Sequence, residues 1–268
     1  MKQPALKGRP TLWRVLRIVA LVLLVVLLLP YLITPLYAVI DPVSTSMLWR
    51  RLTGARVERQ YVPIARISPS LSLAVIVAED GRFCSHHGVD LAELREAFAE
   101  ADDMDEMRGG STITQQLAKN MFLSPERSLS RKIKEALIAI YLENHYTKPE
   151  ILKLYFDRAY LGGGSYGVEA AAQYYFNKSI REVNLSEAAM LAGMFKAPTR
   201  YAPHVNLAAS RARANEVLSN MVEAGFMSEG QVYGARMNPA KIVERGESQT
   251  PDYFLDWAFE DVQRIMHG

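Results

Sequence analysis

The spacing of apolar and polar residues follows the period of an α-helix over most of the chain, and the alternation typical of β-strands is scarce. We therefore expect a mostly α-helical protein. N-caps, prolines and glycine-rich breaks separate the expected helices. These helices cover residues 69–79, 91–101, 112–120, 124–146, 151–160, 168–176, 188–195, 206–224 and 228–237.

The first forty residues carry a different pattern. Residues 18–40 contain no charged side chain, and a helix of this length rises about 34 Å, enough to cross the roughly 30 Å hydrocarbon layer of a bilayer. The basic residues before this segment, with no acidic residue among them, are Lys2, Lys7, Arg9, Arg14 and Arg17. The positive-inside rule then places the N-terminus in the cytoplasm. A cleaved signal peptide is the alternative, but residues 36–40 offer no small-x-small cleavage site, which favours an uncleaved anchor.

Composition and charge exclude some classes of protein. With 268 residues, of which 49% are hydrophobic and 22% charged, the chain resembles an ordinary globular protein with one large or two small domains. Removing the five basic residues of the N-terminal tail from the total of 31 leaves 26, against 29 acidic residues. This balance argues against a nucleic-acid-binding protein. The single cysteine, Cys84, excludes an internal disulfide and is expected to be buried.

Two adjacent carboxylates, Glu79 and Asp80, stand at the end of an apolar helical run. The negative end of the helix dipole and the neighbouring carboxylate both disfavour ionisation, so we expect one of the two pKa values to be raised. Such a carboxyl group is suited to act as a general base. The alternative is a pair of acidic residues that only solvates a helix end. His86 and His87, which follow, lack the spacing of metal ligands on a helix.

A second group of polar residues lies within residues 109–120. With Ser111 as the N-cap, Thr112, Gln116 and Lys119 fall at positions i, i+4 and i+7 on one face of a helix. A helix N-terminus followed by a hydroxyl, an amide and an ammonium group suits a ligand that carries phosphate, whereas an ordinary solvent-exposed face is the alternative. The acidic segment 102–110 before it is expected to be a mobile loop, either solvated or a lid over a site.

The next helix combines two faces. Arg131, Lys132 and Glu135 share one of them, and taken alone Arg131 and Glu135 form an ordinary helical ion pair. An apolar stripe on the other side is expected to face the core; it consists of Ile133, Ala136, Leu137 and Ile140.

Together these motifs resemble those of the peptidoglycan glycosyltransferases, the family shared by monofunctional transglycosylases and the N-terminal part of class A penicillin-binding proteins. The motifs are, in order, Glu79-Asp80-x-x-Phe83-x-x-His86-x-Gly88, Gly110-Ser111-Thr112-Ile113-Thr114-Gln115-Gln116-x-x-Lys119-Asn120 and Arg131-Lys132-x-x-Glu135. The resemblance covers about residues 67–225, and it departs from the family at Asp157, where many members carry Asn. Because no Ser-x-x-Lys or Lys-Thr-Gly motif of a transpeptidase occurs, the chain is either monofunctional or the first part of a longer protein.

The resemblance implies a lysozyme-like, mostly α-helical glycosyltransferase domain with a smaller membrane-proximal lobe. The expected parts are a cytoplasmic tail (1–17), a transmembrane signal-anchor (18–40), a connector (41–66), the catalytic domain (67–240) and a C-terminal extension or linker (241–268). The implied enzyme joins lipid-linked disaccharide-peptide units, lipid II, into β-1,4 glycan strands. The reaction inverts the anomeric carbon and releases lipid pyrophosphate.

The resemblance also implies residue roles. Glu79 is expected to be the base for the acceptor 4-hydroxyl, and Glu135 the second catalytic carboxylate, which either orients cations or stabilises an oxocarbenium-like centre. The residues expected to hold the pyrophosphate are Lys119, Arg131 and Lys132. The other expected substrate-binding residues are Asp80, Phe83, His86, Ser111, Thr112, Gln116 and Asn120. A divalent cation, Mg²⁺ or Mn²⁺, is compatible with this site, although no ligand set in the sequence requires one.

The implied location is the bacterial cytoplasmic membrane, with a single pass and the catalytic domain on the periplasmic side. Implied partners are lipid II, the growing glycan strand, the lipid bilayer and other proteins of cell-wall synthesis, and no nucleic acid. Two other functions stay open. A lysozyme-like peptidoglycan hydrolase or lytic transglycosylase cleaves the same bond, and a scaffold in a wall-synthesis complex needs no catalysis. The cationic residues favour synthesis, because a hydrolase has no pyrophosphate to hold.

Overall fold

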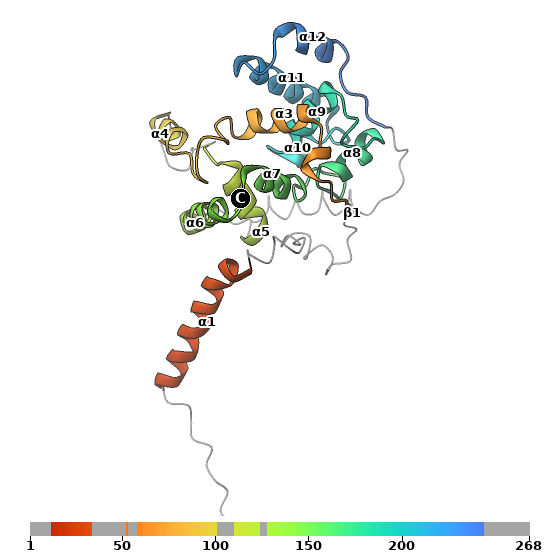
Figure 1. Cartoon of the computed structure of the whole chain (residues 1–268). Coiled ribbons are helices and arrows are strands. Elements are labelled where there is room, and N and C mark those ends of the chain that lie inside the picture. Colours follow the sequence, from red (N-terminus) through yellow and green to blue (C-terminus); the bar gives the residue numbers. More distant parts are fainter. Residues whose placement is uncertain (1–11, 34–51, 53–57, 101–109, 124–127, 244–268) are drawn as a thin grey trace, which may run out of the picture. The chain divides into compact units, whose positions relative to one another are not determined.

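The computed structural model describes residues 12–33, 52, 58–100, 110–123 and 128–243, and this part is mostly helical, as predicted (Figure 1). The chain divides into two compact units, residues 1–42 and 43–268. The elements of the second unit are β1 Glu58–Arg59, the 3₁₀-helix η2 Ile64–Arg66, α3 Pro69–Glu79, α4 Leu91–Glu100, α5 Ile113–Phe122, α6 Leu129–His145, α7 Lys148–Phe156, β2 Ser165–Tyr166, α8 Val168–Phe176, α9 Leu185–Met194, α10 Pro198–Tyr201, α11 Leu207–Glu223 and α12 Glu229–Met237.

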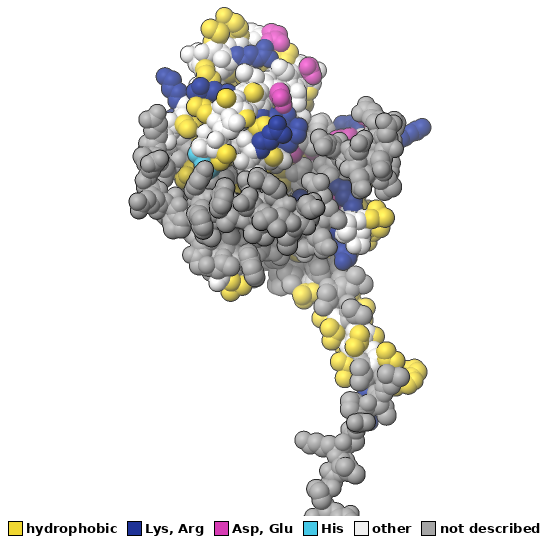
Figure 2. Space-filling model, turned by 180° about the vertical axis from the view of Figure 1, so that it is seen from behind, with side chains coloured by type: hydrophobic (Ala, Val, Ile, Leu, Met, Phe, Trp, Pro, Cys, Tyr) yellow, Lys and Arg dark blue, Asp and Glu magenta, His cyan; other side chains and the backbone are white. Residues whose placement is uncertain are grey.

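The first unit contains α1, Leu12–Ile33, a helix of 22 residues. Hydrophobic side chains gather along it in Figure 2, and Ile18, Leu21 and Leu24 are each more than half exposed. The helix begins before the predicted segment 18–40, of which residues 34–40 lie outside the described residues. Among the residues that the structure describes, no helix meets the length and hydropathy that a membrane span requires.

Three helices, α3, α9 and α11, pack against one another in the second unit (Figure 1). Helix α9 is buried from Ser186 to Met194, and its small side chains let its neighbours approach closely. A Cβ atom on Gly193 of α9 would lie only 2.8 Å from Cγ of Arg213 on α11. This packing positions α3, whose last residue is Glu79.

Helix α5 packs against both α6 and α7. It begins with a capping box, in which the Thr112 hydroxyl accepts a hydrogen bond from the backbone of Gln115 at 3.1 Å and the Gln115 side chain accepts one from the backbone of Thr112 at 3.0 Å. The prediction that Ser111 is the N-cap is therefore wrong. Thr112 is the cap because Gln115 stands at the third helical position after it, which completes the box. As a cap Thr112 is buried, so it leaves the polar face expected to include Gln116 and Lys119.

Helix α6 turns its predicted core stripe outward. Ile133, Leu137 and Ile140 are 54%, 52% and 44% exposed, and Leu129 continues the stripe at 64%. The residues that α6 buries are Glu135, Ile138, Ala139 and Leu142. The prediction of a core stripe is wrong because α6 carries apolar residues on two faces, and the helical period cannot tell which face meets α5.

The segments around α7 follow the predicted pattern more closely. Thr147 and Glu150 form a capping box, so α7 begins at Lys148, before the expected residue 151, and it ends at Phe156 and not at residue 160. The expected break at residues 161–167 contains β2, which pairs in parallel with β1. Gly162, with φ of 82°, is one of several glycines in this break that adopt left-handed backbone conformations. Helix α8 then covers the predicted residues 168–176.

Some predictions fall on residues outside the described ranges. These are the acidic segment 102–109, the helix start at 124–127, residues 41–51 and 53–57 of the connector, and the C-terminal residues 244–268. Cys84 lies within the described part and is exposed, so its predicted burial is wrong. It belongs to the turn after α3, in which Phe83 and His86 take the buried positions.

Candidate active site

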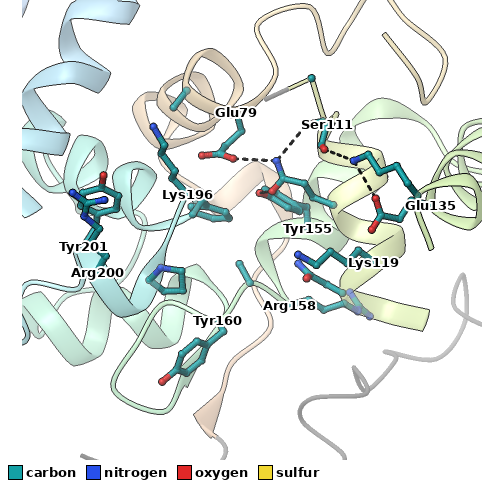
Figure 3. A pocket seen from close by; sticks show the side chains of 18 of the residues that line it. Glu79, Ser111, Lys119, Glu135, Tyr155, Arg158, Tyr160, Lys196, Arg200 and Tyr201 are labelled. Carbon is teal, nitrogen blue, oxygen red and sulfur yellow. Dashed lines mark hydrogen bonds and ion pairs between the residues drawn. The ribbon is translucent and has the colours of Figure 1, made fainter. Parts of the chain in front are cut away.

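A cleft of about 790 Å³ opens in the second unit (Figure 3). Its walls come from the end of α3, from α5, α6 and α7, and from the region between α9 and α11. The polar and charged residues that line it are Glu79, Glu93, Ser111, Gln116, Lys119, Asn120, Arg131, Lys132, Glu135, Tyr155, Arg158, Tyr160, Lys196, Arg200, Tyr201 and Arg213. Seven of these described residues are basic and three are acidic, so the cleft suits an anionic ligand.

Glu79 reaches the cleft from the last position of α3. Its Oε2 atom accepts a hydrogen bond from Nε2 of Gln116 at 3.0 Å (Figure 3). Its Oε1 atom is buried and accepts no hydrogen bond from any described residue. The carboxyl group is therefore held through one oxygen while the other keeps its lone pairs.

Burial raises the pKa of Glu79 above its ordinary value of 4.5. The hydrogen bond from Gln116 and the charges of Arg213 and Lys196 lower the pKa, and the neighbouring Asp80 raises it by the smallest contribution. The predicted direction is confirmed, but the main cause differs from the predicted one. The burial of Glu79 raises its pKa more than the charge of the neighbouring Asp80 does.

A cluster of cations surrounds the second predicted carboxylate. Glu135, which is 2% exposed, pairs with Arg131 and, at 3.2 Å, with Nζ of Lys132. Lys132 also donates a hydrogen bond to the Ser111 hydroxyl, and Lys119 lies on the same side of the cleft (Figure 3). Burial lowers the pKa of Lys132, and the charges of Arg131 and Lys119 lower it further. Three cations facing one carboxylate leave an excess of positive charge that an anion would relieve.

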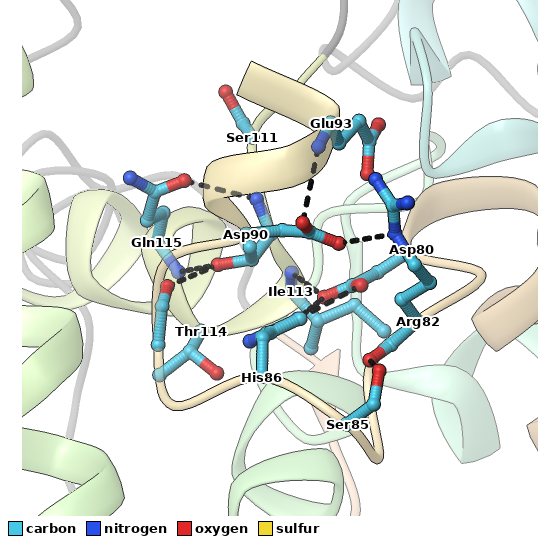
Figure 4. A network of polar contacts seen from close by, with 12 residues as sticks. Asp80, Arg82, Ser85, His86, Asp90, Glu93, Ser111, Ile113, Thr114 and Gln115 are labelled. Carbon is cyan, nitrogen blue, oxygen red and sulfur yellow. Dashed lines mark hydrogen bonds and ion pairs between the residues drawn. The ribbon is translucent and has the colours of Figure 1, made fainter. Parts of the chain in front are cut away.

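A polar network lies behind the cleft (Figure 4). Asp80, which is 2% exposed, lies 3.0 Å from Nε2 of His86 and accepts a hydrogen bond of 2.8 Å from the backbone of Ile113. Because Ile113 is the first residue of α5, this carboxylate ties the end of α3 to the start of α5. The Thr112 hydroxyl adds a hydrogen bond of 2.6 Å to the backbone oxygen of Gly88. The network thus holds the two helices that carry the cleft's acidic and amide side chains.

The structure divides the twelve predicted site residues into two groups. Eight line the cleft: Glu79, Ser111, Gln116, Lys119, Asn120, Arg131, Lys132 and Glu135. Four do not line it and are buried: Asp80, Phe83, His86 and Thr112. Phe83 packs its ring under Nζ of Lys148, which lies 4.4 Å from the ring centroid. The second group is placed to support the wall of the cleft.

The sequence-based reasoning gave no role to several lining residues. Lys196 and Arg200 lie on either side of Pro198, the first residue of α10, and both line the cleft. Two basic residues soon after the apolar helix α9 are the sequence signal that could have pointed to them. Arg158 also lines the cleft. Its neighbour in the chain, Asp157, is the position that departs from the family motif, and this carboxylate pairs with Lys153 at 2.8 Å. Arg213 gave no signal, because it reaches the cleft only through the packing of α11 on α3.

Metal binding has no visible basis in the described ranges. Within them, no group of three or more His, Cys, Asp or Glu side chains is assembled that could hold a metal ion.

The fold and the cleft define the class of protein. A largely helical protein that places a carboxyl group of raised pKa in the same cleft as a cationic cluster has the features of an enzyme that moves a proton next to an anionic group.

Comparisons with known proteins identify the family. A family model described as Transglycosylase matches residues 46–222. A biosynthetic peptidoglycan transglycosylase from Nitrobacter winogradskyi is 46% identical over 188 residues, which are 70% of this chain and 83% of that protein. Penicillin-binding protein 1A from Pseudomonas aeruginosa is 44% identical over 78% of this chain and 25% of that protein. The crystal structure of penicillin-binding protein 1A from Haemophilus influenzae aligns with a TM-score of 0.43 and 24% identity, over 78% of this chain and 22% of that one.

The chain belongs to the transglycosylase family. The predictions of a glycosyltransferase and of a role in peptidoglycan synthesis are confirmed by the family match and by relatives at 44–47% identity. The alignment to the Haemophilus influenzae structure is too weak to add to this assignment.

Proposed function

We propose that this protein joins lipid II units into β-1,4 glycan strands, with inversion at the anomeric carbon and release of lipid pyrophosphate. The observation that carries the proposal is the presence of Glu79 and the cations around Glu135 in one cleft. The reaction needs both, because the acceptor hydroxyl must lose a proton while the departing diphosphate gains negative charge.

Glu79 is the proposed base. As the acceptor 4-hydroxyl attacks the anomeric carbon of the donor, its proton passes to the carboxylate. The carboxyl group lines the cleft, and one of its oxygens, Oε1, accepts no hydrogen bond from the described residues. The raised pKa makes this carboxylate a stronger base than an exposed one. A single general base contributes about 10²- to 10⁴-fold to a rate.

The cationic cluster is the proposed site for the diphosphate. Lys119, Arg131 and Lys132 hold it and neutralise the charge that develops when the anomeric bond breaks. The lowered pKa of Lys132 supports this role, because an arriving anion offsets the repulsion from its cationic neighbours. The two ion pairs of Glu135 favour a role in orienting these cations over direct stabilisation of an oxocarbenium-like centre.

The decisive experiment separates synthesis from hydrolysis. The full chain, purified in detergent, is incubated with labelled lipid II in one reaction and with preformed glycan strands in another. We expect polymer in the first and no shortening in the second. Shortened strands without polymer would instead identify a hydrolase or lytic transglycosylase.

Two variants test the site. Glu79→Gln should lower the rate of polymerisation about 10²- to 10⁴-fold, whereas a scaffold would show no activity to lose. Glu93→Gln is the matched control, because Glu93 is a second carboxylate in the cleft lining whose pKa is also raised by burial. It should retain most of the activity. Equal losses in the two variants would contradict a specific role for Glu79.

We also propose that residues 18–40 anchor the protein in the cytoplasmic membrane, with the N-terminus in the cytoplasm and the catalytic domain on the periplasmic side. Residues 18–33 of this segment belong to α1, and their exposed side chains are apolar. Because the lipid tail of the substrate stays in the bilayer, tethering raises the effective concentration of enzyme and substrate. Extraction of the protein from membranes by alkaline carbonate would contradict this anchoring.

The apolar face of α6 supports a further contact with the bilayer. Ile133, Leu137 and Ile140 are about half exposed on this helix, which also carries Arg131 and Lys132 of the proposed diphosphate site. A bilayer against this face would bring the lipid headgroup close to those cations. The double variant Ile133→Ser/Leu137→Ser should slow polymerisation of lipid II in vesicles more than in detergent, and equal effects would argue against the contact.

A divalent cation beside the diphosphate and association with other proteins of cell-wall synthesis stay predictions. The first is tested by chelation, as described below, and the second by crosslinking of the protein in intact cells followed by identification of the linked chains.

A further inference from the structure

A chain of two hydrogen bonds connects α7 to the proposed base. The hydroxyl of Tyr155 donates to Oε1 of Gln116 at 2.7 Å, and Nε2 of Gln116 donates to Oε2 of Glu79 at 3.0 Å (Figure 3). The three residues lie on α7, α5 and α3, so the chain runs through three helices.

The direction of both hydrogen bonds is determined by their ends. Tyr155 is 2% exposed, and burial, together with the charges of Glu79 and Asp80, raises the pKa of its hydroxyl well above 10.0. The hydroxyl therefore keeps its proton and donates it. An ionised carboxylate only accepts hydrogen bonds. Gln116 thus has to turn its carbonyl toward Tyr155 and its amide toward Glu79.

The position of Tyr155 is itself held by packing. Its ring lies 5.1 Å from that of Phe195 and 6.4 Å from that of Phe156, measured between centroids. The Gln116 side chain, by contrast, makes one further hydrogen bond with the described residues, of 3.4 Å from Nε2 to the backbone oxygen of Ser111. The tyrosine hydroxyl is therefore the donor that holds the Gln116 carbonyl, while Glu79 and the backbone oxygen of Ser111 hold the amide nitrogen.

We propose that Tyr155 is a positioning residue for the reaction, which acts through Gln116 to keep Oε2 of Glu79 hydrogen-bonded and so favours the ionised form of this carboxyl group. This proposal rests on the proposed function of Glu79 as the base. Without the tyrosine hydroxyl, the Gln116 amide can turn its carbonyl toward Glu79. The carboxylate then loses its hydrogen bond and faces a second oxygen, which disfavours its ionised form.

Other groups also act on the charge of Glu79. Arg213 on α11 and Lys196 after α9 favour the ionised form, and Asp80 disfavours it. None of these changes when the Tyr155 hydroxyl is removed, so a change in the titration of Glu79 in the variant reports the orientation of the Gln116 amide.

The first test follows the titration of Glu79 directly. In the full chain labelled with ¹³C at the glutamate carboxyl groups, the signal of Glu79 is assigned by its absence in Glu79→Gln. We expect its pKa to be higher in Tyr155→Phe than in the wild type. An unchanged titration would overturn the proposal, and this result does not depend on whether the protein polymerises lipid II.

The second test measures polymerisation as a function of pH. In Tyr155→Phe we expect kcat to fall about two- to tenfold, the effect of one hydrogen bond, while KM stays unchanged. The acid limb of the profile should move to higher pH, so that part of the loss is recovered in alkaline buffer. A uniform loss at every pH would indicate a purely structural role and overturn the proposal.

Two further variants separate positioning from packing. Gln116→Leu removes both hydrogen bonds, so adding Tyr155→Phe to it should cause no further shift of the acid limb, and additive shifts would contradict the mechanism. Tyr175→Phe is the matched control. Tyr175 is also 2% exposed and donates a hydrogen bond of 2.8 Å to the backbone of Leu161, but it does not line the cleft. This control should leave the titration of Glu79 unchanged.

Discussion

Replacing Glu79 by Gln tests two consequences of the placement of one half-buried carboxyl group. The replacement amide has almost the same shape, and its oxygen can still accept the 3.0 Å hydrogen bond from Gln116. The fold should therefore be retained while the base is lost. With about 10²- to 10⁴-fold of rate expected from a general base, kcat should fall by this factor, which corresponds to about 2.7–5.4 kcal/mol of activation free energy.

The same substitution should not weaken the fold at neutral pH. Because the pKa of Glu79 is raised in the folded protein, the folded state binds a proton more tightly than the unfolded chain. Below the ordinary value of 4.5 both states are protonated and there is no penalty. As the pH rises from 4.5 through the raised pKa, the free energy of unfolding falls, and above that pKa the penalty is complete. Glu79→Gln lacks this titration.

The assay combines polymer formation from labelled lipid II with thermal unfolding of both proteins at about pH 4 and about pH 8. We expect the Tm of the variant, relative to that of the wild type, to rise between these two pH values. Polymerisation at more than about one tenth of the wild-type rate would refute the role of Glu79 as the base. A relative Tm that falls with increasing pH would refute the burial argument, whatever the activity.

Three other perturbations probe the surroundings of the site. Glu135→Gln leaves Arg131 and Lys132 without their buried partner. Because the Lys132 side chain is 37% exposed and its charge is screened by solvent, we expect at most about 3 kcal/mol of destabilisation in thermal unfolding. We also expect a higher KM for lipid II, and an unchanged KM would argue against the diphosphate site. Gly88→Ala should lower the free energy of unfolding in denaturant by at least about 2 kcal/mol. Gly88 has φ of 87°, and the Cβ atom of an alanine there would lie 2.8 Å from the backbone of Ala139. Unchanged stability would contradict this close approach. Removal of divalent cations by EDTA should slow polymerisation if such an ion assists the diphosphate, and full activity after chelation would remove the cation from the mechanism.

Local signals predicted the helix ends well. The capping boxes at Thr147 and Asn184 each begin with a capping residue that is followed three positions later by Glu, a signal that needs only near neighbours in the chain. The same rule explains the error at the start of α5, where Gln115 completes a box with Thr112 and not with Ser111. Helix boundaries are thus readable from sequence when the capping partner is also considered.

The sequence predicted the buried face of a helix less well than it predicted the capping residues. Helix α6 has two apolar faces, and the one with Ile133 and Leu137 lies exposed. Arg213 reaches the cleft from a helix that carries no local sign of a functional role. In each case the outcome depends on which other helix packs alongside, and the residues of one segment contain no information about that neighbour.

The sequence by itself determined the helical class, most helix starts, and the order of motifs that places the chain in its family, because these depend on near neighbours in the chain. The tertiary structure alone decided that Glu79 is half-buried and held by Gln116, that Arg131 and Lys119 lie close to Lys132, and that one cleft contains both Glu79 and Lys132. Burial and the meeting of distant segments set the proton affinities of these groups, and both arise only when α3, α5, α6 and α7 pack together.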